Sequence, residues 1–534
     1  MHRPLPPLFA LALGILALAM LMPASAAAIL GEWRAGRSFL YAGIATGFAA
    51  AIVGVALSGA RRFPGGQGEL VALVGCWVLL PVFAALPVHL ITPQIGFAGA
   101  WFEMVAAFTT TGGTIYAAPD TLPLPLHLWR GLVGWLGGLL TLSAAYAILA
   151  PRRLGGFEVL LQSDAEGARD GGTAGRGALG LSAGFASIET RLRRALRAIL
   201  PVYAGLTLAL ALVLHMLGQG PIVAGVHAMA VLSTSGISAH AAGLASQSNI
   251  LAELAIAVFL VLAATRLIYA RASQIGARTG PFRDPELRLM AALVAVVSAA
   301  LFLRHWVAVL SLEAAQRQGL GDALEAFWGG VFTALSFLTT TGFESAFWDS
   351  ARSWSGLPSP GLVLLGLCAI GGGAATTAGG VKLIRVASLL RQGVQELDHL
   401  AQPNAVLGSG SGLHGRSTGQ GAFIAWAFVM LYVFAVFAVT LALGLLGMPF
   451  ERALIAALAA ITNTGPVYAA VLGPEASFGL IDPAGRAILS IGMILGRIEA
   501  LVIIALFSPD LWRRFAQREK TAGKALPGPS QSRW

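Results

Sequence analysis

The sequence predicts an all-α polytopic membrane protein, and three observations lead to this prediction. Of its 534 residues, 56% are hydrophobic and only 11% are charged, whereas a soluble protein carries about 25% charged residues. Ten apolar runs have about the length of 20 residues that crosses a hydrocarbon core. A loop rich in threonine, serine and glycine recurs four times among these runs. We therefore expect about ten transmembrane helices, arranged partly as repeats.

The apolar runs are the candidate membrane spans. They cover residues 8–30, 38–59, 70–91, 126–150, 196–217, 250–270, 287–310, 360–390, 422–447 and 484–507. A soluble protein with buried helices is the alternative, and the length of the runs and their shortage of charge disfavour it. At the N-terminus, Met1-His2-Arg3, the apolar stretch from Leu8 to Met22 and the following Pro-Ala-Ser-Ala-Ala-Ala are also typical of a signal peptide. We expect this first run to be retained, because it continues to Leu30 with another span close behind.

The positive charges gather in alternate loops. Basic clusters lie at Arg61–Arg62, Arg152–Arg153, Arg191–Arg197, Arg271–Arg288, Lys382–Arg391 and Arg513–Lys520. Cytoplasmic loops carry an excess of Lys and Arg, so this alternation predicts that both termini are cytoplasmic. It also explains the net charge of +10 without a nucleic-acid partner. Cys76 and Cys368 fall within spans and do not indicate a disulfide framework.

The chain divides into two N-terminal helices and four repeats. We place the N-terminal helices at 1–66 and the repeats at 67–190, 191–285, 286–417 and 418–534. Each repeat has a short apolar stretch between two longer ones, at 98–109, 221–233, 325–339 and 451–462. These stretches are too short to span and predict re-entrant helices. Each repeat then begins and ends in the cytoplasm, so four parallel repeats can surround one axis with pseudo-fourfold symmetry.

Four loops follow the short stretches. We name them loop one (Thr109–Thr114), loop two (Ser233–Ser238), loop three (Thr339–Glu344) and loop four (Thr462–Val467). The candidate ion-binding residues are Thr110, Thr111, Gly112, Thr234, Ser235, Gly236, Thr340, Thr341, Gly342, Asn463, Thr464 and Gly465. Close helix packing by small residues is the alternative explanation for one loop, but four copies favour a common function.

Physical chemistry indicates what such loops do. Non-helical backbone at membrane depth must line a cavity, and a selectivity filter turns backbone carbonyls toward an ion in place of its water shell. Glycine adopts the required dihedrals without steric cost. The short helices direct their partially negative C-terminal ends at the centre, which favours a cation. The four loops therefore predict a single cation pore, with hydroxyls that either add ligands or tie the loops together.

The loops and three further motifs resemble the Trk/Ktr/HKT superfamily of potassium transporters, and within it the bacterial TrkH-type subunit. The further motifs are Gly134–Gly138, Gly371–Lys382 and Gly496–Glu499. The resemblance implies potassium as the substrate, held at the loop residues, and a location in the bacterial inner membrane. Glycine in all four loops resembles potassium-selective members. The resemblance also implies a homodimer and a cytosolic nucleotide-binding gating ring similar to TrkA.

Two other functions remain as alternatives. A secondary transporter for a cation or another solute predicts inverted repeats and mid-span acids, whereas the repeats here are parallel. A membrane-embedded enzyme is disfavoured because the nine histidines are scattered; we expect no enzymatic activity and no transition-metal site. A glycine pattern at Gly410–Gly415 has no preceding strand, so it does not predict a dinucleotide site. We expect the chain to bind no cofactor.

A gate is predicted beneath the loops. The run from Gly361 to Arg391 is about 31 residues, or roughly 46 Å if helical, which exceeds the membrane thickness. It contains Gly371, Gly372, Gly373, Gly379 and Gly380, and each glycine costs about 1 kcal/mol in a helix relative to alanine. We expect the helix to break there and the broken backbone to line the pathway. A glycine-rich packing face is the alternative. The resemblance implies an intramembrane gating loop.

Five charged or polar side chains also attract attention. Arg497 lies in a span, where a charge is usually functional; it predicts a barrier to cations, and a structural pair with Glu499 or another acid is the alternative. Lys382 and Arg385 fit the cytoplasmic excess of basic residues, or contact a regulatory partner. Glu103 and His227 each lie nine residues before a loop glycine. For Glu103 we expect either a cation site at the outer mouth or stabilisation of a helix N-terminus.

Overall fold

The computed structural model describes residues 8–58, 67–150, 188–241, 243–244, 249–269, 284–311, 320–357, 359–401, 419–473 and 475–498. Every regular element in these ranges is a helix, which confirms the predicted all-α class. The segments at Gly410–Gly415 and Arg513–Lys520, and the residue Glu499, lie outside the described residues.

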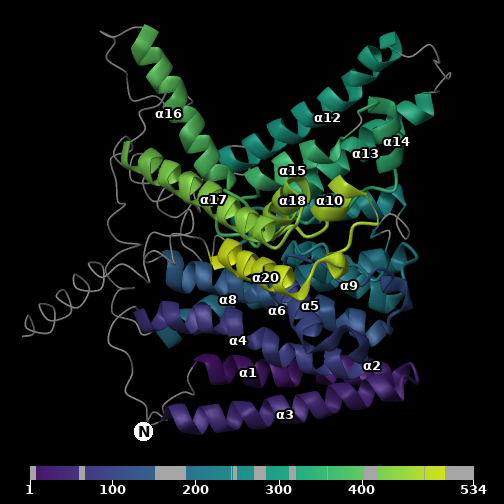
Figure 1. Ribbon diagram of the computed structural model, residues 1–534, viewed down its shortest axis with the longest axis vertical. Coiled ribbons are helices and arrows are strands. Elements are labelled where there is room, and N and C mark those ends of the chain that lie inside the picture. The colour runs from purple at the N-terminus through teal and green to yellow at the C-terminus, as the bar shows by residue number, and fades with distance from the viewer. Residues whose placement is uncertain are drawn as a thin grey trace, which may run out of the picture.

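The N-terminal part forms one edge of the molecule. It consists of α1 (Leu8–Ala19), α2 (Leu21–Ile29) and α3 (Trp33–Ser58). Helices α1 and α2 together make one apolar span from Phe9 to Ile29. Figure 1 shows them lying alongside α3 at the purple end of the molecule, where α1 also packs against α4.

The rest of the chain consists of four groups of helices in the same order. The groups are α4 (Gln67–Ile91), α5 (Gly96–Phe108) and α6 (Leu124–Ala144); α8 (Ile188–Met216), α9 (Pro221–Ser233) and α10 (Ile250–Ala263); α12 (Pro285–Ser311), α13 (Leu320–Leu338), α15 (Gly361–Ile370) and α16 (Leu383–Ala401); and α17 (Gly419–Leu445), α18 (Phe450–Ile461) and α20 (Pro483–Ile498). Shorter elements lie between and beyond them: η1 (Pro93–Ile95), η2 (Pro119–Thr121), η3 (Ala145–Leu149), η5 (Arg266–Tyr269), α14 (Trp348–Ser355), α19 (Val467–Leu472) and η7 (Phe478–Leu480).

The described helices include six that are long and apolar enough to cross a membrane. The ten runs predicted from the sequence are therefore not ten uniform spans. The run 250–270 gives a helix that ends at Ala263, after which Arg266 approaches the carboxylate of Asp284 at 3.5 Å. The run 360–390 is interrupted between α15 and α16. The first helix ends shortly before the ion pair of Arg266, and the second is interrupted at the glycine-rich segment.

The outer surface of the described helices carries large apolar side chains. On α17, Phe423, Phe434 and Phe437 are all exposed. A water-soluble protein rarely leaves contiguous apolar patches of this kind. The long apolar helices and their apolar outer faces indicate a multi-span membrane protein.

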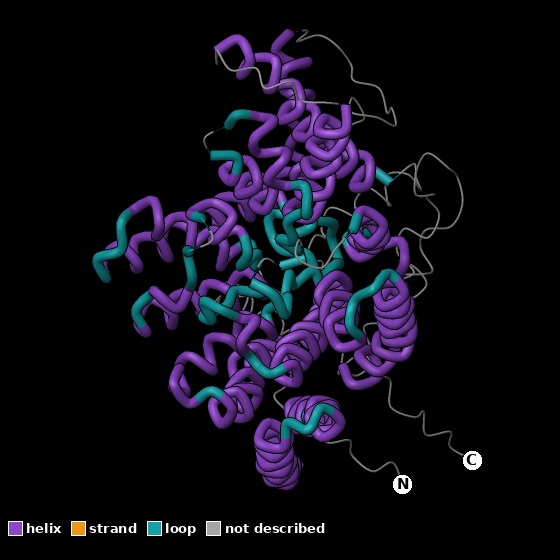
Figure 2. Tube along the Cα trace, turned by 90° about the vertical axis from the view of Figure 1, so that its right-hand side faces the viewer, coloured by secondary structure: helices purple, strands orange, loops and turns teal. Residues whose placement is uncertain are grey.

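The interior brings together segments that are distant in the sequence. In Figure 2 the loop segments gather near the middle of the molecule, with helices around them. Trp129, Phe102 and Phe337 are fully buried in the packing around this region. The four short helices α5, α9, α13 and α18 thus end in a close-packed centre, and each is followed by one of the four loops.

Candidate functional site

All four short helices end in the same way. In loop one, the N–H of Thr110 donates to the carbonyl of Ala107 at 2.9 Å, and the N–H of Thr111 donates to Ala106 at 2.8 Å. This pair of bonds is a Schellman motif, which usually needs a glycine in the left-handed conformation. Here non-glycine residues take that place: Thr110, Thr234, Thr340 and Asn463 have φ of 54°, 52°, 58° and 53°.

A left-handed threonine is costly, by about 1 kcal/mol or more, so the surroundings must hold it. Each of these residues stands two positions before a loop glycine and is buried. Strained backbone of this kind tends to cluster at functional sites. The same strain at equivalent positions in four loops indicates one shared architecture.

The loop glycines allow the loops to meet. A Cβ added to Gly112 would overlap the carbonyl oxygen of Ser235, and one on Gly236 would overlap that of Thr341. A Cβ on Gly342 would lie 2.9 Å from the side chain of Pro466. Loop four returns to loop one, since the Gly465 N–H donates to the Thr111 carbonyl at 2.6 Å. The loops therefore contact one another in the cyclic order one, two, three, four.

Hydroxyl side chains are hydrogen-bonded to one another within loops one, two and three. The hydroxyls of Thr109 and Thr111 are 2.8 Å apart, those of Ser233 and Ser235 3.0 Å, and those of Thr339 and Thr341 3.1 Å. The structure thus supports the tying role that the sequence left open. The predicted ion-binding residues lie together at the centre of the molecule. Their threonine, serine and asparagine residues are buried, whereas Gly112 and Gly236 are half-buried.

The glycine-rich segment 371–382 breaks the helix, as expected. Helix α15 ends at Ile370, and Gly371 and Gly380 both have φ of 76°. The two ends of the segment close on each other, because the N–H of Lys382 donates to the carbonyl of Ile370 at 2.9 Å. The segment is a compact buried turn within the membrane region rather than a continued helix.

This segment lies against loops two, three and four. The Gly379 N–H donates to Thr340 Oγ1 at 2.7 Å, and the hydroxyls of Thr377 and Thr234 are 3.1 Å apart. A Cβ on Gly379 would overlap the Thr462 carbonyl of loop four. Of the five glycines proposed from the sequence, Gly379 lies directly against the loops. A Cβ added to Gly371, Gly372, Gly373 or Gly380 would instead first meet the segment itself, Ala264 or Cys368.

Arg497 completes the contact with loop one. Its Nε donates to the Thr109 carbonyl at 2.8 Å and its Nη1 to the Thr377 carbonyl at 2.5 Å, and Nη2 donates to Thr110 Oγ1. These three acceptors are neutral oxygens, so the contacts differ from the alternative of an ion pair. The guanidinium joins the strained Thr110 to the segment 371–382.

Comparison with known proteins identifies the family. A family model described as TrkH, cation transport protein, matches residues 67–514. The chain belongs to the TrkH cation transport family. The family member TrkI, a Trk system potassium uptake protein of Halomonas elongata, is 30% identical over 448 residues, covering 82% of each chain. TrkH of Escherichia coli K12, another Trk system potassium uptake protein, is 27% identical and covers 84% of this chain and 86% of its own.

A solved TrkH structure also matches. The crystal structure of the potassium transporter TrkH from Vibrio parahaemolyticus superposes with a TM-score of 0.75 at 26% identity, covering 94% of this chain and 98% of that chain. The described helices are therefore those of a multi-span TrkH-type membrane protein. Because this family is one of transport proteins, the enzyme alternative falls away.

Two expectations for side chains in this TrkH-family chain are wrong. Glu103 lies in the middle of α5, which begins at Gly96, so it does not stabilise a helix N-terminus. It is 1% exposed and paired with Arg130 at 2.7 Å, so it is not a cation site at the outer mouth either. Arg385 is fully buried over the ring of Phe428, at 3.7 Å from its centroid, and does not contribute to a partner surface.

Sequence reasoning missed two features of the TrkH-type site. The left-handed conformation two residues before each glycine was not predicted, although Thr, Thr, Thr and Asn recur at that position. The bridge between the segments that follow loops one and two was also missed. There, Asp120 accepts from His240 Nδ1 at 2.8 Å and from the Ala241 N–H at 3.1 Å. The hydrogen bond from His240 holds the pKa of Asp120 below its usual range.

Proposed function

We propose that this chain takes up potassium across the bacterial inner membrane through one pore lined by the four loops. The ring of four loops, each with the same strained helix end, is the observation that carries this proposal. Its TrkH relatives are named potassium uptake proteins. Four parallel repeats surround the pore with pseudo-fourfold symmetry, after two N-terminal spans.

Backbone carbonyls of the loops act as the selectivity filter in this proposal. Successive carbonyls replace the water shell of the ion, and the missing side chains at Gly112, Gly236 and Gly342 let the loops approach one axis. The short helices support the ion with the negative ends of their dipoles. Potassium is the substrate held here, and the chain needs no other bound cofactor.

The segment 371–382 acts as the gate below the filter. In the described conformation it is hydrogen-bonded to Thr340 and to Arg497, so ions pass only when these contacts are released. The charge of Arg497 adds an electrostatic barrier to cations beside the pathway. Gate movement therefore requires Arg497 and the segment to separate.

We propose that both termini and the basic loops face the cytoplasm, following the excess of positive charge there. The chain pairs as a homodimer, and a cytosolic nucleotide-binding ring similar to TrkA moves the gate. This arrangement rests on the family to which the chain belongs. A ring partner acts on the cytoplasmic end of α16, which continues directly from the gate segment.

Potassium uptake by liposomes that contain the purified protein tests the proposal, measured with and without a ring partner. We expect uptake by the unmodified chain and at least a tenfold loss in the variant Gly112→Ser, because a Cβ there overlaps Ser235. The control is Gly366→Ala, where a Cβ meets nothing within 4 Å. Absence of potassium uptake under both conditions would refute the proposal.

A further inference from the structure

One position on each short helix is equivalent relative to the loop that follows. It lies nine residues before the loop glycine. The four residues there are Glu103, His227, Thr333 and Ala456. Because all four share this place relative to their loops, their side chains can be compared directly, and the structure gives each a different degree of contact.

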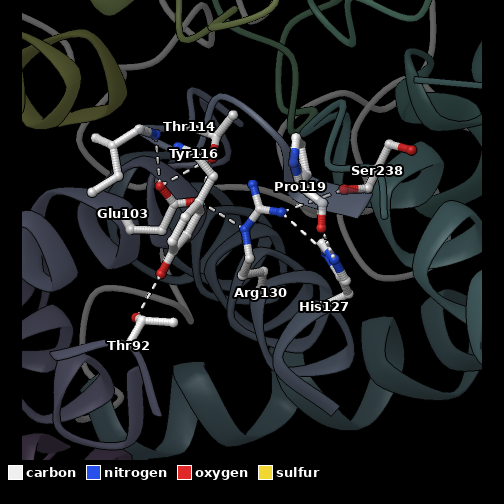
Figure 3. Close-up of polar contacts among 9 residues, drawn as sticks. Thr92, Glu103, Thr114, Tyr116, Pro119, His127, Arg130 and Ser238 are labelled. Carbon is white, nitrogen blue, oxygen red and sulfur yellow. Dashed lines mark hydrogen bonds and ion pairs between the residues drawn. The ribbon is translucent and has the colours of Figure 1, made fainter. Parts of the chain in front are cut away.

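Glu103 makes the most contacts. Its carboxylate accepts a hydrogen bond from the Thr114 hydroxyl at 3.0 Å and one from the Ile115 N–H at 3.0 Å. Its Oε1 also pairs with Nε of Arg130 at 2.7 Å. Figure 3 shows the carboxylate between the backbone of loop one and the guanidinium. The first loop is therefore fixed, beyond its glycine, by a charged side chain.

Arg130 links loop one to loop two through hydrogen bonds. Its Nη1 donates to the Ser238 carbonyl at 3.4 Å and to Nδ1 of His127 at 3.2 Å. Since Nδ1 accepts, the proton of His127 is on Nε2, which donates to the Pro119 carbonyl at 3.0 Å. Figure 3 shows this chain of polar contacts running from loop one to Ser238.

The polar contacts made from this helix position decline from the first loop to the fourth, although the segment after loop three is also held by Glu253 of α10, whose carboxylate accepts from the Ser345 hydroxyl at 2.7 Å and the Ala346 N–H at 2.6 Å. Nε2 of His227 lies 3.1 Å from the hydroxyl of Ser238, and Thr333 Oγ1 accepts from the Ser345 N–H at 3.2 Å. Ala456 has no polar side-chain atom, so loop four has no such bond. Loop four also differs at its glycine, because left-handed φ occurs at the other three loop glycines and not at Gly465.

We propose that Glu103, with Arg130, is a positioning residue for ion selection, and that the side chains at this position fix the four loops to graded extents. The inference rests on the proposed potassium pore. A small shift of the carbonyls changes how well they replace the water shell of one ion rather than another. A buried ion pair holds a fixed geometry only while its partners and hydrogen bonds are complete, so weakening this pair relaxes loops one and two together.

The experiment compares potassium and sodium uptake in liposomes that contain the full chain. Glu103→Gln keeps the size of the side chain but lacks the charge and one acceptor. We expect the potassium-to-sodium ratio to fall at least fivefold, and the half-saturating potassium concentration to rise, with a maximal rate within twofold of the unmodified chain. Thr333→Val, which removes one hydrogen bond, should lower the ratio about twofold.

A second variant covers the case in which Glu103→Gln does not fold. Arg130→Lys keeps a positive charge beside Glu103 but lacks the fork that also reaches Ser238, so we expect an intermediate fall in the ratio. The matched control is Asp349→Asn, which removes an ion pair with Arg352 whose side chains are 94% and 51% exposed. That control should leave the ratio unchanged.

The outcomes separate this inference from the proposed pore. If the unmodified chain takes up potassium and the folded Glu103 or Arg130 variants keep its ion ratio within a factor of about 1.5, the positioning role is refuted. The same holds if these variants lower the maximal rate alone. If the unmodified chain takes up no potassium, the proposed function itself fails, and with it the basis for the positioning role.

Discussion

Helix α6 and the segment 371–382 are both rich in glycine and occupy the same place in their repeats, yet they fold differently. Helix α6 is the helix that follows loop one, and the segment 371–382 lies between α15 and α16, which follow loop three. Helix α6 runs unbroken from Leu124 to Ala144, although it contains Gly131, Gly134, Gly137 and Gly138. The segment 371–382 is not helical and separates α15 from α16.

The glycines of α6 allow close packing. A Cβ on Gly137 would overlap the Phe108 carbonyl at the end of α5. One on Gly134 would lie 3.0 Å from the side chain of Ile237, and one on Gly138 would lie 2.6 Å from the hydroxyl of Tyr203. Most of these glycines are three or four residues apart, which places them along one side of a helix. The helix is kept because close neighbours offset the cost of glycine.

The glycines of the segment 371–382 instead change the direction of the chain. Three are consecutive and two more are adjacent, so no helix face collects them. Gly371 and Gly380 adopt left-handed φ, which glycine does without steric cost. The comparison shows that the spacing of the glycines, and not their number, indicates whether a glycine-rich stretch stays helical and packs closely or breaks the helix. The sequence left a glycine-rich packing face open as an alternative for the segment 371–382. That description fits α6 instead.

The largest expected effect is loss of the folded protein when the packing face of α6 is filled. Gly137→Val places a branched side chain onto the Phe108 backbone, and overpacking typically costs about 1–3 kcal/mol, more where backbone must move. We expect the yield of monodisperse protein in size-exclusion chromatography to fall about tenfold. Gly205→Ala is the control, since a Cβ there meets nothing within 4 Å. Normal yield and uptake by the valine variant would remove the packing explanation for α6.

The next effect is a leak when the segment 371–382 loses its contact with Arg497. Arg497→Ala removes a positive charge and the hydrogen bonds to Thr109, Thr110 and Thr377. A contribution of about 1.4 kcal/mol corresponds to a factor of about ten. We expect flux through the closed state in liposomes to rise by that factor.

A companion variant separates the two contributions of this arginine. Arg497→Lys keeps the charge but has a single ammonium in place of the planar fork, so we expect a smaller rise in flux than with alanine. Unchanged closed-state flux in the alanine variant would show that Arg497 neither repels cations nor holds the segment 371–382 in place.

The smallest effect concerns the backbone of the break itself. In Gly371→Ala the new residue must adopt φ of 76°, and its Cβ would overlap the Gly379 carbonyl unless the segment shifts. A left-handed alanine costs about 1 kcal/mol or more, which corresponds to about a fivefold change in an equilibrium. We expect the closed segment to be destabilised and the closed-state flux to rise about fivefold. Gly366→Ala, one turn earlier in α15, should leave the flux unchanged, and an equal rise in both variants would contradict the role of the break.

Much of the fold could be predicted because the relevant signals are local. The short stretch predicted at 221–233 coincides with α9, and the break was expected from consecutive glycines. The predicted stretch 325–339 begins five residues after the actual start of α13 at Leu320, because the polar residues before it, such as Asp322, do not look like membrane helix. The four-loop pattern identified the residues that meet at the centre.

The contacts within the site could not be predicted to the same extent. Arg497 contacts Thr109 and Thr110, which precede it by almost 400 residues, and its contacts there are with neutral oxygens. Glu103 was assigned to an outer mouth or a helix end, but it faces Arg130 in the interior. Neither partner follows from sequence spacing, since each depends on how two separate helices are placed.

The sequence by itself determined the class of protein, the repeats, the loops and the position of the helix break. These features depend on transfer of apolar side chains from water and on the backbone freedom of glycine, which are properties of short stretches of chain. The tertiary structure decided which glycines serve packing, which left-handed residues are tolerated, and which side chains hold the loops. Those outcomes depend on distances between atoms of elements that are far apart in the chain, and differences of a few tenths of an ångström matter. Only the packed interior fixes such distances.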